Sequence, residues 1–111
     1  MNGLKRQINT VYYDIHAHSA QTSVAEDVVA CYNVIVGKGT LSDVSSGQPV
    51  SCGIHPWYIR EEAVVEQLAR FRELVLNEQV IMIGEAGLDK QISIPLDMQV
   101  KVFEEQIRVS E

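Results

Sequence analysis

The chain has 111 residues, a formal net charge of −6 at pH 7 and 46% hydrophobic residues. Its length suits one small domain, and this composition allows a packed core rather than a disordered chain. The negative charge disfavours a broad basic surface for nucleic-acid phosphates, so a phosphate ligand would need a local cation. Cys31 and Cys52 lack metal-type spacing and are too few for a disulfide scaffold, which predicts reduced thiols in a cytoplasmic protein. No apolar run reaches membrane length, and no signal peptide is recognisable.

The first predicted element is a strand from Val11 to His16, which opens with the apolar run at residues 11–13. Residues 1–10 are polar and are expected to lead into a single domain over residues 11–111. A polar loop follows at residues 19–23, and two signals then conflict. Residues 23–26 (Ser-Val-Ala-Glu) have the form of a helix capping box, whereas residues 28–36 are rich in valine and isoleucine. We predict a buried strand over 28–36, with at most one helical turn before it.

A loop, a strand and a helix are predicted in the middle of the chain. Residues 37–49 are rich in glycine and serine and indicate a loop, followed by a short strand over 50–54. Pro56 keeps His55 extended at the carboxyl end of this strand. Residues 61–78 read as an amphipathic helix with an apolar stripe of Val64, Leu68, Phe71 and Val75.

The last predicted elements are an apolar strand over residues 80–83 and a helix that begins at Ser93, with Pro95 in its first turn. The expected apolar stripe of this helix is Leu96, Val100, Phe103 and Ile107. The helical pattern continues to residue 111 without a terminating signal, so the sequence looks cut inside a helix. Strands that alternate with helices predict an α/β fold on a mainly parallel sheet.

Two histidines, His16 and His18, stand at the end of the first predicted strand. Side chains two apart in a strand lie on the same face, so the two imidazoles are expected to converge on one point. Two imidazole nitrogens suit a divalent metal of the zinc type, and Asp14 could orient one ring. The alternative is a chance His-x-His at a strand end, exposed or bonded to the backbone.

Other polar residues fall at the same edge of the predicted sheet. His55 follows the third apolar strand and Glu85 follows the fourth, and ligands of parallel α/β folds gather at the carboxyl ends of strands. Glu85 lies between two glycines, which leave its carboxylate unshielded. A surface carboxylate at a turn is the simpler alternative for Glu85 alone. Together with the histidines, it indicates a site at this edge.

Three motifs in order resemble the TatD family of metal-dependent hydrolases. They are Asp-Ile-His-Ala-His at residues 14–18, Gly-Ile-His-Pro-Trp at 53–57 and Ile-Gly-Glu-Ala-Gly-Leu-Asp at 83–89. Gln99, Phe103 and Gln106 also fit the stretch that follows the glutamate motif in that family. His-x-His also opens the PHP phosphoesterases, but the second and third motifs do not suit them. The family belongs to the amidohydrolase-like TIM barrels and includes deoxyribonucleases.

The resemblance implies roles for individual residues. His16 and His18 would bind one divalent metal ion (zinc, magnesium or manganese), and Glu85 would bridge two such ions in the full family site. His55 would line the substrate pocket as a catalytic or substrate-binding group. Trp57 would flank the substrate or pack over the barrel mouth, and Asp14 and Asp89 would be supporting groups. The implied reaction is metal-assisted hydrolysis of a phosphodiester or another small ester or amide, with DNA as one candidate substrate.

The chain departs from the family in length and in ligands. An eight-stranded barrel needs roughly 200–250 residues, whereas this sequence supplies about four strands and predicts an incomplete (half) barrel. The family has two further histidines and an aspartate from later strands, but this chain has three histidines in all. We therefore expect at most one metal ion here, and a homo-oligomer that covers open sheet edges. The competing hypotheses are a non-catalytic half-barrel that self-associates and a protein that binds metal without turnover.

Overall fold

The computed structural model describes residues 10–18 and 28–111. Residues 1–9 of the predicted lead-in (1–10), the loop at 19–23 and the capping box at 23–26 lie outside the described residues. Four β-strands and two α-helices follow in the order β1 (Tyr12–Ala17), β2 (Val28–Ile35), β3 (Val50–Gly53), α1 (Val64–Leu74), β4 (Val80–Ile83) and α2 (Leu96–Ser110). Short 3-10 helices lie at Leu41–Asp43, Pro56–Tyr58 and Glu61–Ala63.

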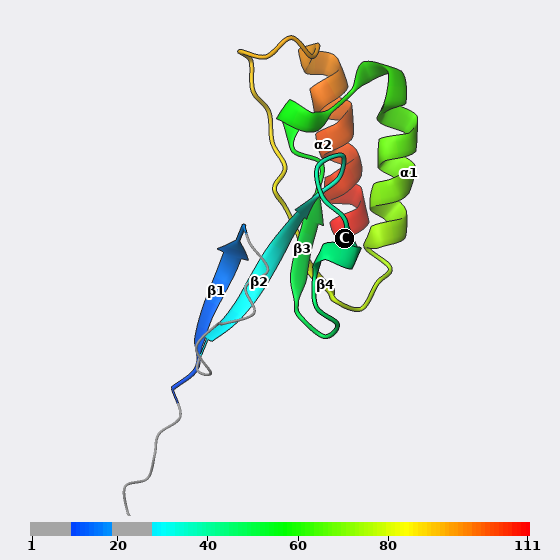
Figure 1. Cartoon of the computed structure of the whole chain (residues 1–111). Helices are drawn as coiled ribbons and strands as arrows, with labels where there is room; N and C mark the ends of the chain where they lie inside the picture. The colour runs from blue at the N-terminus through cyan, green and yellow to red at the C-terminus, as the bar shows by residue number, and fades with distance from the viewer. Residues whose placement is uncertain (1–9, 19–27) are drawn as a thin grey trace, which may run out of the picture.

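The four strands form one parallel sheet in the order β1-β2-β3-β4. Strands that are consecutive in the sequence are neighbours in the sheet, as in an α/β barrel. Within residues 10–18 and 28–111 the sheet is not closed, so β1 and β4 are its two edges (Figure 1). The predicted incomplete TIM-barrel-like fold is confirmed.

Both helices cover one face of the sheet and contact each other beside β3 and β4 (Figure 1). The register places Val34 opposite Cys52, so their side chains share a face, and both are 1% exposed. From α1, Phe71 is fully buried against this face, and α2 contributes Val102. The core therefore lies between the helices and the central strands β2 and β3.

β1 lies farthest from the helices and is paired only with β2 among the described strands (Figure 1). Tyr13 and Ile15 on this strand are 72% and 66% exposed. The pairing of β1 with β2 shifts register between Asp14 and Ala17. Backbone hydrogen bonds to β2 thus hold β1 in place more than side-chain burial does.

Both helices differ from their predicted ranges. α1 ends at Leu74 instead of residue 78, and the chain turns so that Leu76 is 84% exposed. In the turn, the Asn77 side chain accepts a hydrogen bond from the Gln79 N–H, an alternative to a further helical turn. α2 begins at Leu96, because Pro95 is extended, with ψ of 137°, and precedes the helix instead of lying in its first turn.

The buried face of α2 is also different from the expected stripe. Leu96 and Ile107 are 43% and 46% exposed, whereas the buried residues of this helix are Gln99, Val102 and Gln106. Gln106 accepts a hydrogen bond from the Ile54 N–H at 2.9 Å and donates to the Ile54 carbonyl at 3.3 Å. The Gln106 amide thus satisfies the backbone groups of Ile54, the residue that follows the end of β3.

The two cysteines are free, as predicted. Burial raises the pKa of the Cys52 thiol to about 11, and burial is also the main cause that raises the pKa of Cys31. Within residues 10–18 and 28–111, neither helix is long and apolar enough to cross a membrane.

Candidate metal site at the carboxyl edge of the sheet

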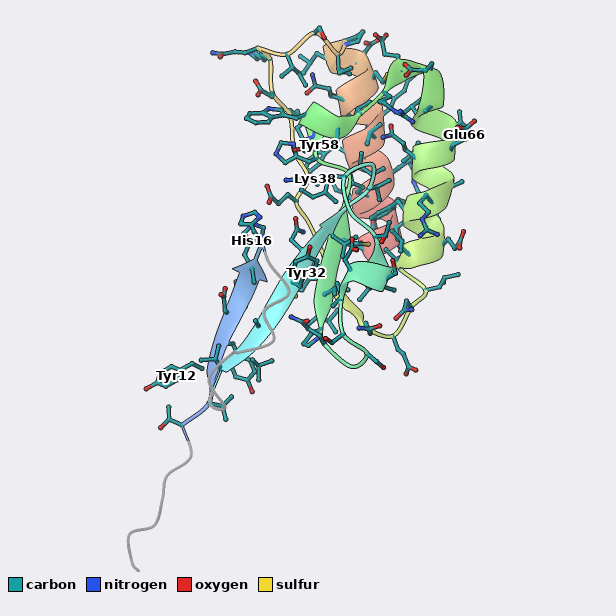
Figure 2. The ribbon with its side chains drawn as sticks, in the orientation of Figure 1. Tyr12, His16, Tyr32, Lys38, Tyr58 and Glu66 are labelled. Carbon is teal, nitrogen blue, oxygen red and sulfur yellow. The ribbon has the colours of Figure 1, made fainter. Side chains whose placement is uncertain are left out.

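His16 and His18 come together at the carboxyl end of β1. Their ring centroids are 4.5 Å apart, with the planes nearly perpendicular. Figure 2 shows His16 at the tip of the strand, and its side chain is 43% exposed. The Asp14 carboxylate accepts a hydrogen bond from the His16 backbone N–H at 3.2 Å. Asp14 thereby contacts the strand end that carries the two imidazoles.

Glu85, which follows the fourth strand, lies at the same edge of the sheet. It lies two residues after the end of β4, and the Gly84–Glu85 peptide bond is cis. Its Oε2 atom is 2.9 Å from Nε2 of His16, and its Oε1 atom is 3.6 Å from Nε2 of His55. Residues far apart in the sequence, from β1, β3 and β4, thus meet around one carboxylate.

One ligand atom from each of His16, His18 and Glu85 lies within 4.8 Å of the other two. Two imidazole nitrogens and a carboxylate oxygen form a known catalytic type of zinc set, in which each ligand atom lies about 2.0–2.2 Å from the ion. Three protein ligands leave a coordination position open to water or substrate. The donor chemistry and spacing therefore fit one divalent ion.

His55 stands on the other side of Glu85, and its ring is oriented by the backbone. Its Nδ1 atom accepts a hydrogen bond from the Trp57 N–H at 3.1 Å. In a neutral imidazole an accepting Nδ1 leaves the proton on Nε2, which is the nitrogen that points to Glu85. The turn at Pro56–Tyr58 thereby directs His55 toward the site.

Trp57 is 64% exposed, and its indole Nε1 donates to Oδ2 of Asp89 at 2.7 Å. This bond joins the loop after β3 to the loop after β4. An open pocket of about 300 Å³ lies between the two loops, with His55, Trp57, Glu85 and Asp89 among its lining residues. The pocket adjoins the three-ligand cluster, because Glu85 belongs to both.

The comparisons agree with this arrangement of motifs on strand ends. A family model described as TatD related DNase matches residues 13–111. The chain belongs to the TatD family. The match begins at the second residue of β1 and covers the rest of the described chain, including His16, His18, His55 and Glu85. A comparison with curated proteins finds no match. At the level of the family, the TatD assignment indicates a hydrolase of the nuclease type.

The bond between Trp57 and Asp89 leads to a testable titration. The indole donor, helped by the Gln91 N–H, lowers the pKa of the Asp89 carboxyl below its ordinary value. We expect Trp57→Phe to raise this pKa, since the ring remains and its N–H donor is lost. A lowered pKa means that the contribution of Asp89 to stability is present above its ordinary pKa and is lost as pH falls through the folded value. In Trp57→Phe the contribution should be smaller, and its loss should be complete at a higher pH, because the folded value lies closer to the ordinary pKa.

The check is a carboxyl-carbon NMR titration of Asp89 in the two proteins. Tyr58→Phe is the matched control, because it alters the next aromatic ring and leaves the indole donor in place. An Asp89 titration that is the same in Trp57→Phe and the native protein would contradict the assignment of the indole as the main cause.

Sequence reasoning did not single out Lys38 and Tyr58, which lie at the same edge of this TatD-family sheet (Figure 2). The Lys38 ammonium is 5.5 Å from the centre of the Tyr58 ring, and that ring lies 5.8 Å from the ring of His55. A signal was present: Lys38 follows the predicted second strand just as His55 follows the third. Through the Tyr58 ring, Lys38 places a positive charge near the loop that carries His55.

Proposed function

We propose that this chain carries a metal-dependent hydrolase site in which His16, His18 and Glu85 hold a single divalent ion. The proximity of their three ligand atoms, all within 4.8 Å, is the observation that supports it. Zinc suits this nitrogen and oxygen set, and magnesium and manganese are the alternatives. In the full family site Glu85 would bridge two ions. The further histidines that would hold the second ion have no counterpart here, because this chain has three histidines in all.

The other residues at the edge are assigned to the substrate. His55 lies beside Glu85 and lines the pocket, where its Nε2 proton can face an oxygen of a phosphate or carbonyl group. Trp57 flanks this pocket, and Asp89 holds the indole in place. Asp14 supports the end of β1 through the His16 N–H. A bound divalent ion would supply activation of a water and polarisation of the scissile group.

The proposed substrates are phosphodiesters, DNA among them, or another small hydrolysable ester or amide. Family membership supports the phosphodiester class. The net charge of −6 disfavours tight non-specific binding to a long nucleic acid, so recognition would depend on the ion and on nearby groups such as Lys38. We further propose that residues 11–111 form one domain with residues 1–10 as its lead-in, and that the free thiols reflect a cytoplasmic location.

Hydrolysis is tested with protein loaded with zinc, magnesium or manganese in turn. Bis(4-nitrophenyl) phosphate and a short single-stranded oligodeoxynucleotide are the substrates, and a chelator-treated sample is the control. We expect turnover that requires the ion and is lost in Glu85→Gln. Turnover that is equal with and without chelator, or in the Glu85→Gln protein, would refute the proposed site.

A second candidate function is a non-catalytic half-barrel that self-associates. The observation that favours it is the pair of open edges: β4 has Ile81 at 61% exposure, and β1 has Ile15 at 66%. An exposed apolar edge strand is a template for pairing with another chain. Sedimentation at several protein concentrations distinguishes the two: concentration-dependent association without metal-dependent turnover favours the non-catalytic half-barrel.

A further inference from the structure

Asn33 is a buried amide in the middle of β2 that the proposed reaction does not use. It is 6% exposed and faces away from the helices, opposite Ser51 in the sheet register. Its Nδ2 group donates to Oγ of Ser51 at 2.9 Å and to the Gly84 carbonyl at 2.6 Å. Its Oδ1 atom has no hydrogen-bond partner among the described residues. A buried acceptor without a partner costs free energy. The burial of this amide therefore calls for a role that its two donor bonds serve.

The orientation of the Asn33 amide follows from its surroundings. Ser51 can accept or donate, but a carbonyl oxygen such as that of Gly84 can only accept. Rotation of the amide by half a turn would place two carbonyl oxygens 2.6 Å apart, which is repulsive. The N–H therefore belongs on the Gly84 side, and this bond crosses from β2 to the residue that follows β4.

Gly53, at the end of β3, packs closely against the Gly84–Glu85 peptide unit. A Cβ atom at this position would lie 2.6 Å from the Glu85 carbonyl oxygen and 2.7 Å from the Gly84 carbonyl carbon. Such distances are well inside van der Waals contact, so no other residue fits without displacing the Gly84–Glu85 backbone. The Gly84 N–H also donates to the Cys52 carbonyl at 3.0 Å. The backbone that carries Glu85 is thus held from both β2 and β3.

We propose that Asn33 is a positioning residue for Glu85. Its bond to the Gly84 carbonyl, with the close packing at Gly53, fixes the peptide from which the Glu85 side chain reaches Nε2 of His16. Asn33 itself contacts neither the proposed ion nor the pocket. This inference rests on the proposed function for its effect on metal binding, but the placement of Glu85 can be measured without metal.

The variant that tests it is Asn33→Leu, which keeps a similar side-chain size and removes both N–H donors. Zinc affinity is measured by competition with a chromophoric chelator, and we expect the dissociation constant to rise about 10–100-fold, as when a partner of a metal ligand is lost. Ser51→Ala removes one acceptor and leaves the Gly84 bond, so its zinc affinity should match the native protein. Val102→Ala, a core substitution away from the site, controls for lost stability alone.

The second readout is the crystal structure of the metal-free Asn33→Leu protein. We expect the Glu85 carboxylate to leave hydrogen-bond distance of His16, and a native Glu85 position would overturn the proposal. Equal zinc affinity in the native and Asn33→Leu proteins would also overturn it. If the native chain binds no zinc, the proposed function fails, and the metal-free structure alone decides the role of Asn33. Asn33→Ala replaces the first variant if that variant does not fold.

Discussion

The double variant His16→Ala/His18→Ala is expected to lose stoichiometric metal uptake. Both imidazole ligands of the three-residue cluster are removed, and the carboxylate of Glu85 alone cannot hold a divalent ion against water. The fold should survive, because the His16 side chain is 43% exposed and β1 is exposed along most of its length. Metal content is measured by mass spectrometry after loading and gel filtration, with circular dichroism as the check on folding.

His55→Ala is the matched control for this experiment, since it removes the remaining histidine of the chain. His55 approaches Glu85 but is not one of the three clustered ligands, so the His55→Ala protein should retain about one ion per chain. The site would be wrong if the double variant kept the native metal content, or if loss of His55 alone removed the ion.

Phe71→Ala is expected to lower the free energy of unfolding by about 3–5 kcal/mol, the range for a fully buried phenylalanine in a core. Phe71 is 0% exposed and lies where α1 packs on the central strands. A domain of this size has a total stability of about 5–15 kcal/mol, so the variant should lose a large fraction of it. Urea denaturation followed by tryptophan fluorescence measures the change.

Val65→Ala on the same helix is its control. Val65 is 76% exposed, so its truncation should change the free energy of unfolding by no more than about 0.5 kcal/mol. Similar losses in the two variants would mean that α1 does not cover the sheet through Phe71.

Much of the fold could be predicted because its signals are local. The valine-rich and isoleucine-rich runs at 28–36 and 80–83 gave strands that nearly coincide with β2 and β4. The polar residues His16, His18, His55 and Glu85, at the ends of predicted strands, could be placed at one edge, because parallel strands present their carboxyl ends together. The proximity of His16 to Glu85 follows from that argument, even though 69 positions separate them in the sequence (85 − 16 = 69).

The remaining features depend on tertiary partners that no local pattern contains. The burial of Gln99 and Gln106 at 1% exposure becomes favourable only because backbone groups of distant loops need their amides. An exposed helix face was the natural expectation for glutamine. The register shift in β1 and the contact of Asn33 with Gly84 are likewise set by the neighbouring strand. Family resemblance could mark Gln99 and Gln106 as fitting, but it could not give their bonds.

The position of β1 has a consequence for the cooperativity of the molecule. β1 and the residue after it supply two of the three clustered side chains, whereas the backbone before Glu85 is bonded to the well-packed central strands. A strand that pairs on one side and buries little side-chain area belongs to the least protected part of a native state and opens by local unfolding. A ligand that binds His16, His18 and Glu85 together would hold β1 against the central strands. Ligand binding and the local folding of β1 would then be one coupled equilibrium, and part of the binding free energy would go into closing that strand.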